Sequence, residues 1–164
     1  MKNISDYEMP PVLRDFLSYL QTIKGKSANT VLVYFYDLRV FFRFLKIHKN
    51  LAGSETDFDK IDICDIGVEL LKTVNLSDLY AFMSYVSNSR DNTSYARARK
   101  VASLKSFYNY LTNKAKLLDT NPAGELESPK IIKRLPRYLN IEESKQLLSS
   151  IGGEHAERDF AIVT

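Results

Sequence analysis

Cysteine is almost absent from this chain of 164 residues. The single cysteine, Cys64, excludes an internal disulfide and a zinc site built from several cysteines. Its neighbours Ile63 and Ile66 predict that it packs as a small apolar residue. Apolar runs of membrane-spanning length are also missing, and the N-terminus MKNISDYEMPP has no apolar core of signal-peptide length. We therefore expect a soluble, cytoplasmic protein with no membrane partner.

An excess of one charge is also lacking, because the net charge is only +3, which does not by itself indicate a nucleic-acid binder. The distribution of charge is uneven. Residues 51–78 carry seven acidic side chains against two lysines, whereas residues 97–137 are strongly basic. A local basic surface attracts phosphate even on a nearly neutral chain. Solvated helix faces of opposite sign are the alternative explanation of this pattern.

Apolar residues recur at three- and four-residue spacing along most of the chain, which is typical of amphipathic helices. Ser27, the Asn75–Asp78 pair and Thr93 or Asn92 are expected N-terminal caps. The expected helices cover residues 12–23, 31–45, 65–72, 76–86, 93–111, 141–148 and 155–164. The second has a wide aromatic stripe, which predicts the central core helix. No segment alternates at period two, so the predicted fold is all-α.

The most informative stretch is residues 97–137. Its first part combines a buried apolar face with a cationic side, and three prolines in its second part prevent regular helix. The apolar residues 160–163 then stand without a cap, which predicts that the parent protein continues beyond Thr164. We expect one domain over residues 1–127, a basic proline-containing linker over 128–139, and the truncated start of a second domain over 140–164.

Several motifs resemble, in order, the N-terminal part of tyrosine recombinases of the Xer and phage-integrase type. Residues 27–45 resemble the family's "S.NT...Y..DL..F..FL" helix, and residues 99–108 resemble its "R.LS.LRSFY" helix. Residues 121–136 carry the Asn-Pro-Ala, Pro-Lys and Leu-Pro elements of its linker. Residues 139–143 and 158–162 resemble the opening of its catalytic domain. Each motif is weak alone, and their shared order and spacing make the resemblance specific.

The resemblance implies an orthogonal bundle of four main helices, the core-binding domain with a SAM-like fold. In the family this domain forms half of a clamp around duplex DNA, and the catalytic domain forms the other half. A tyrosine of the catalytic domain forms a 3′-phosphotyrosyl bond, while arginine, lysine and histidine-type residues stabilise the transition state. The covalent intermediate conserves bond energy, so the resemblance implies no ATP, metal or other cofactor.

The catalytic residues of the family would lie beyond Thr164. The chain as given is therefore expected to bind DNA without cutting it, and none of its ten tyrosines is a candidate nucleophile. The full-length protein is expected to assemble with other protomers on a recombination site.

The resemblance also implies that the second helix and the long basic helix face the major groove. The candidate DNA-binding residues are the cations and polar donors of these helices and of the linker: Lys24, Lys26, Ser27, Asn29, Thr30, Asn92, Thr93, Ser94, Arg97, Arg99, Lys100, Lys105, Lys130, Lys133, Arg134 and Arg137. Ser94, Arg97 and Lys100 share an i, i+3 row, so one groove could take all three. Arginine can read guanine, whereas lysine more often contacts phosphate. The alternatives are pure capping for Ser27 and Thr30 and solvated surface charge for any single cation.

Two other functions fit the same composition. A stand-alone helical DNA-binding regulator would also carry a basic helix. A helical protein-interaction module would use the aromatic residues at 34–44 as a partner groove. Salt-dependent binding to duplex DNA separates the second alternative from the recombinase hypothesis, because phosphate contacts release counterions.

Overall fold

The computed structural model describes residues 7–53, 56–88, 93–130 and 140–163. Within these ranges the chain forms α-helices and one short 3-10 helix and no strand, so the all-α prediction is confirmed. The chain divides into two compact units, Met1–Ile131 and Ile132–Thr164. The first unit contains α1 (Pro11–Thr22), α2 (Ala28–His48), η2 (Phe58–Lys60), α3 (Val68–Lys72), α4 (Leu76–Asn88) and α5 (Ser94–Asn113), and the second contains α6 (Ile141–Ser149) and α7 (Ala156–Val163).

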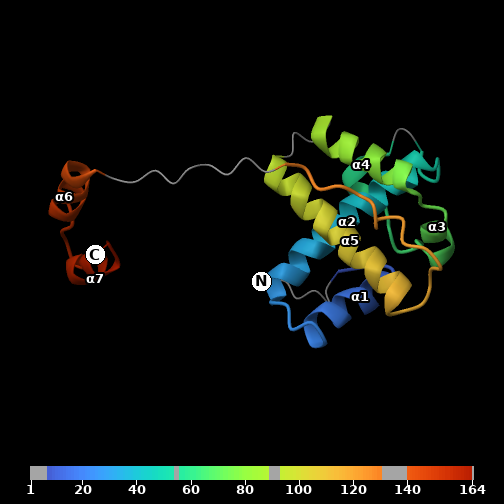
Figure 1. The fold of residues 1–164 in the computed structure, drawn as a ribbon, viewed down its shortest axis with the longest axis horizontal. Coiled ribbons are helices and arrows are strands. Elements are labelled where there is room, and N and C mark those ends of the chain that lie inside the picture. The colour runs from blue at the N-terminus through green and yellow to red at the C-terminus, as the bar shows by residue number, and fades with distance from the viewer. Residues whose placement is uncertain (1–6, 54–55, 89–92, 131–139, 164) are drawn as a thin grey trace. The chain divides into compact units, whose positions relative to one another are not determined.

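The first unit is built around α2, which packs against α1, α4 and α5 (Figure 1). Its aromatic stripe is buried, as the sequence predicts, and α5 crosses α2. The Phe41 ring lies 5.2 Å from that of Phe82 in α4, and the Phe42 ring lies 5.7 Å from that of Phe107 in α5. Phe16 of α1 also reaches Phe107, at 5.3 Å. Interlocking rings therefore join four helices into one core.

Local sequence signals set the helix starts. Ser27 caps α2 and Thr93 caps α5, each by accepting the backbone N–H three residues later at 3.3 Å. Asn75 and Asp78 exchange side-chain to backbone hydrogen bonds of 3.0 Å at the start of α4. Gly25 adopts a φ of +60° in the turn between α1 and α2, a conformation that favours glycine.

The acidic residues at 51–78, which we call the acidic segment, pack along the C-terminal half of α2 where the structure describes them. Their carboxylates pair with cations that project from that helix: Arg43 with Asp59 at 3.0 Å, Lys46 with Asp65 at 2.8 Å and Lys49 with Asp78 at 2.9 Å. The charge of this segment is therefore largely matched inside the unit.

The expected packing role of Cys64 is wrong, because this residue is exposed. The Asp62 carboxylate accepts the Cys64 backbone N–H at 3.0 Å in a local turn. This turn leaves Ile63 and Ile66 buried on either side of the exposed Cys64.

The second unit begins with a complete capping box. Asn140 accepts the backbone N–H of Glu143 at 2.7 Å, and the Glu143 carboxylate accepts that of Asn140 at 2.9 Å. α6 ends before Gly153, whose φ of +93° requires glycine, and α7 follows. The expected linker at 128–139 lies mostly outside the described residues. No helix in the described ranges is long and apolar enough to cross a membrane.

Asp78 predicts a pH dependence of stability. Burial alone would raise the pKa of its carboxyl, but hydrogen bonds from Lys49, the Asn75 backbone and His48 outweigh burial and lower that pKa. A carboxyl with a lowered folded-state pKa stabilises the fold above its unfolded-state pKa of about 4, and this contribution is lost as the pH falls through the folded-state pKa. Between about pH 5 and pH 3, urea titrations should show a larger loss of unfolding free energy for the wild type than for Asp78→Asn. Equal losses would contradict this assignment.

Candidate nucleic-acid interface

Two of the segments predicted to contact DNA lie together on the surface of the first unit. A shallow hollow brings the turn between α1 and α2 next to the outer face of α5. The residues that line it are Tyr19, Leu20, Lys24, Lys26, Ser106, Asn109 and Tyr110. Both lysines are exposed, and the Lys24 ammonium lies 6.0 Å from the centre of the Tyr19 ring. The fold therefore places two cations of the turn beside polar side chains of α5.

The outer face of α5 extends from this hollow toward the start of the helix. Asn109, Ser106, Ala102 and Arg99 follow one another at three- and four-residue spacing, so they share one side of α5. Arg99, Ala102 and Asn109 are exposed, while Ser106 and the adjacent Lys105 are half-buried. We call this surface, made of Lys24, Lys26, Arg99, Lys105, Ser106 and Asn109, the basic face.

The start of α2 adjoins the same turn. Ser27 and Asn29 are exposed and Thr30 is half-buried. The Ser27 and Thr30 hydroxyls lie 2.9 Å apart, and Ser27 also accepts the Thr30 backbone N–H. These bonds give both residues a capping role, whereas the Asn29 amide points to no partner in the described ranges. The free N–H groups of the first turn add a preference for anions.

Lys100 lies in the interior rather than on the basic face. It is 6% exposed, and its ammonium donates to Asp37 of α2 at 2.6 Å. The Asp37 carboxylate is 2% exposed and also accepts from Arg99 Nη2 and Ser103 Oγ, both at 3.0 Å. A buried and paired ammonium is not free to contact a phosphate, so Lys100 is not part of the candidate interface.

The other members of this row, Ser94 and Arg97, are not freely exposed either. Arg97 is half-buried and donates from Nη1 to Ser87 of α4. Ser94 is half-buried in the first turn of α5. A single DNA groove therefore does not receive Ser94, Arg97 and Lys100 together, because this row borders the apolar face that packs on α2 and α4. Thr93 remains exposed at the cap.

The linker cations are only partly placed. Lys130 is exposed in the first unit. Lys133, Arg134 and Arg137, together with Asn92 before α5, lie outside the described residues.

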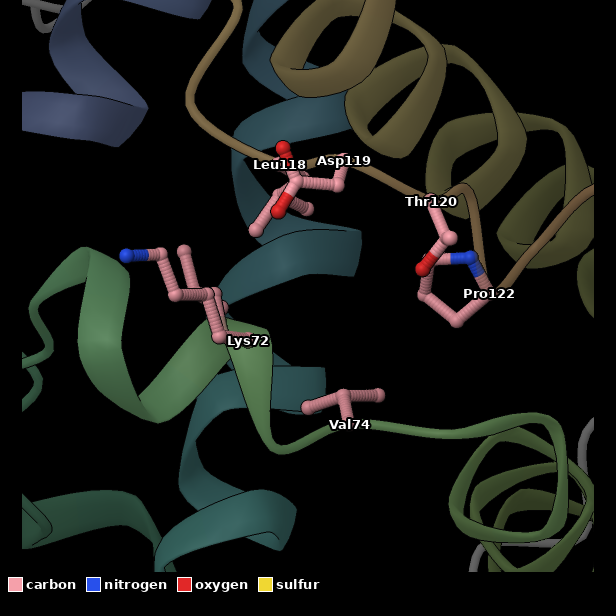
Figure 2. Close-up of a pocket in the computed structure, with 7 residues that line it drawn as sticks. Lys72, Val74, Leu118, Asp119, Thr120 and Pro122 are labelled. Carbon is pink, nitrogen blue, oxygen red and sulfur yellow. The ribbon is translucent and has the colours of Figure 1, made fainter.

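A second pocket lies between α3 and the segment that follows α5 (Figure 2). It is lined by Leu71, Lys72, Val74, Leu118, Asp119, Thr120 and Pro122, none of which is a predicted DNA-binding residue. The Lys72 ammonium pairs with Glu69 at 2.9 Å, on its own helix. Within the described ranges no group of three or more histidine, cysteine, aspartate or glutamate residues is placed to hold a metal ion. The basic face is therefore the better candidate site.

Residues absent from the predicted set also belong to this site. Ser106 and Asn109 line the hollow, and their spacing from Arg99 along α5 was the available signal. Asp37 of α2 is buried beneath this site and accepts a hydrogen bond from Arg99. Its signal was an acidic residue inside the apolar stripe of α2, a position where a carboxylate requires partners.

The first unit is thus an all-helical domain with a basic face on two adjoining segments. Comparison with curated proteins shows what it is related to. The chain is 55% identical to the tyrosine recombinase XerC of Caldanaerobacter subterraneus subsp. tengcongensis over 155 residues, which cover 94% of the chain and 44% of the relative. It is 36% identical to XerC of Myxococcus xanthus over 82% of the chain and 38% of the relative. It is 31% identical to XerD of Listeria monocytogenes over 87% of the chain and 41% of the relative.

The chain is homologous to the N-terminal part of the Xer tyrosine recombinases. It spans less than half the length of these curated relatives. Comparisons with protein-family models and with solved structures give no match.

The burial of Lys100 gives a testable difference between two lysines of α5. Lys100→Met removes one partner of the buried Asp37 carboxylate, so it should lower the unfolding free energy by about 1–3 kcal/mol. Lys105→Met removes a half-buried cation with no ion pair to another described residue, and it should change that free energy by less than about 0.5 kcal/mol. Urea unfolding of both variants checks this. Equal effects would place Lys100 at the surface.

Proposed function

We propose that the chain is the DNA-binding part of a site-specific tyrosine recombinase or integrase. In this role residues 1–127 act as a core-binding domain that clamps duplex DNA, and residues 128–139 form a linker to a catalytic domain that begins near residue 140. Cleavage and rejoining of the DNA would belong to the rest of the parent protein, with other recombinase protomers on the same DNA. Homology to XerC and XerD proteins supports this proposal.

The observation that carries the proposal is the basic face. Lys24, Lys26 and Lys105 make no ion pair with any residue that the structure describes. Arg43 and Lys46 near the end of α2, and Lys49 at its C-cap, are instead paired with the acidic segment. Two of these lysines, Lys24 and Lys26, line one hollow, and unpaired lysines are suited to attract a phosphate backbone. Polar groups at Ser106 and Asn109 can donate to the same backbone.

The protein-interaction alternative finds less support. It requires an accessible aromatic groove at residues 34–44, but Phe35, Phe41 and Phe42 are fully buried, and the half-buried aromatic residues there are Tyr34 and Tyr36. The phenylalanine rings form the core, where they contact other helices of the unit. A stand-alone DNA-binding regulator would use the same basic face, and a recombination assay on the complete parent protein would separate it from the recombinase.

Fluorescence anisotropy with a short labelled duplex of arbitrary sequence tests the DNA-binding proposal. The wild-type chain should bind with an affinity that falls as salt rises, because phosphate contacts release counterions. Lys24→Ala/Lys26→Ala should weaken binding and reduce the slope of log affinity against log salt by about 1–2, since each phosphate contact contributes about 0.9.

The matched control is Lys60→Ala/Lys72→Ala, which removes the same charge. Lys60 and Lys72 are exposed lysines that pair with Asp57 and Glu69 respectively. This control should leave the salt slope near that of the wild type. A wild-type affinity that does not respond to salt would refute DNA binding, and equal effects of the two double variants would refute the location of the interface.

A further inference from the structure

The buried cluster beneath the basic face has an unequal number of charges. One carboxylate, Asp37, faces two cations, Lys100 and Arg99. Lys100 is buried with Asp37 and makes the shorter contact, 2.6 Å against 3.0 Å. It therefore supplies the counter-charge that a buried carboxylate requires. Arg99 is not needed for neutrality, so its bond to Asp37 calls for another explanation.

Arg99 occupies the boundary between the cluster and solvent. Its side chain remains 45% exposed, and only Nη2 donates to Asp37. A guanidinium carries five N–H donors in a fixed plane. Holding one nitrogen from the interior therefore restricts the orientations of this plane, while other donors stay available at the surface. A lysine at this position could not be held in this way, because its donors rotate about a single nitrogen.

Ser103 strengthens this arrangement. Its hydroxyl lies 3.0 Å from Asp37 Oδ2 and 3.2 Å from the backbone carbonyl of Arg99, which is one turn earlier in α5. Asp37 Oδ1 meanwhile accepts from both Lys100 and Arg99. Both carboxylate oxygens are thus engaged, which fixes the carboxylate that holds the guanidinium.

We propose that Asp37 is a positioning residue that orders the guanidinium of Arg99 on the basic face before DNA arrives. This inference rests on the proposed function. An arginine that is already ordered loses less side-chain entropy when it contacts DNA, so its contact is stronger than that of a free arginine. Asp37 itself does not contact DNA, because it is buried between α2 and α5.

A double-mutant cycle tests this role. Asp37→Asn alone would leave the Lys100 ammonium buried without a counter-charge and could unfold the protein. The first change is therefore Asp37→Asn/Lys100→Met, which neutralises both buried partners and leaves the net charge unaltered. The second change is Arg99→Ala, which leaves the Asp37–Lys100 pair intact. Duplex DNA affinity is measured by anisotropy for the wild type, both variants and their combination.

The Asp37→Asn/Lys100→Met variant, called the neutral pair below, should weaken DNA binding about three- to tenfold when Arg99 is present. This is the range expected for ordering one long side chain. It should change affinity by less than about twofold in the Arg99→Ala background. Lys100→Met alone is the control, and it should keep near wild-type affinity because Asp37 still holds Arg99. Urea unfolding of the same proteins is the stability control. Any loss of unfolding free energy caused by the neutral pair should be the same with Arg99 and with Arg99→Ala.

Other outcomes overturn the inference. Equal losses of affinity in both backgrounds would show that Asp37 acts only through the fold. Tighter binding by the Asp37→Asn/Lys100→Met variant would show that Asp37 competes with DNA for Arg99, and unchanged binding would show that Arg99 needs no ordering by Asp37. If the wild type itself fails to bind duplex DNA, the proposed function fails first; if it binds and the cycle shows no coupling, only the role of Asp37 is refuted.

Discussion

Asp37 is the one acidic residue within α2 and α5, and its buried carboxylate constrains how these helices meet. A buried carboxylate is costly unless it is paired and hydrogen-bonded. Here Arg99, Lys100 and Ser103 meet this requirement from one turn of α5. Because all three must reach the same carboxylate, the rotation and axial position of α5 against α2 are fixed. With that rotation set, Ala102, Ser106 and Asn109 face outward, and the basic face follows from the buried contact.

The distribution of charge across α2 explains how a chain with a net charge of only +3 can present a basic surface. Arg43 and Lys46 lie near the end of the helix and Lys49 lies at its C-cap, and the acidic segment pairs with these cations. The opposite end follows a turn that carries Lys24 and Lys26 with no carboxylate paired to them in the described ranges. Negative charge is thus paired with cations near the C-terminal end of α2, and positive charge remains accessible near its N-terminal end.

Local features of the fold could be predicted from the sequence, whereas the partners of charged residues could not. Helix starts depend on residues three positions apart, so the caps predicted at Ser27 and the Asn75–Asp78 pair are confirmed, and Thr93, one of the two candidates there, caps α5. Lys100 was placed on the surface because a lysine beside an apolar face usually extends into solvent. Its partner lies 63 residues earlier in the sequence, and no local pattern connects the two. The prediction that Cys64 is buried is wrong for a related reason. The Asp62 carboxylate accepts the Cys64 backbone N–H, and the apolar neighbours of Cys64 do not reveal this turn.

The same reasoning separates two kinds of cation on the proposed interface. Lys24 and Lys26 flank Gly25 in an exposed turn, and no carboxylate of the described residues pairs with their ammonium groups. Such side chains follow a phosphate backbone of any sequence, because they act as mobile point charges. Arg99 is held from the interior, so its donors keep a fixed direction relative to α5. A fixed guanidinium can distinguish one register of DNA along the helix from another, which mobile lysines cannot do. The buried carboxylate therefore links the stability of the helix crossing to the orientation of the Arg99 donors on the basic face.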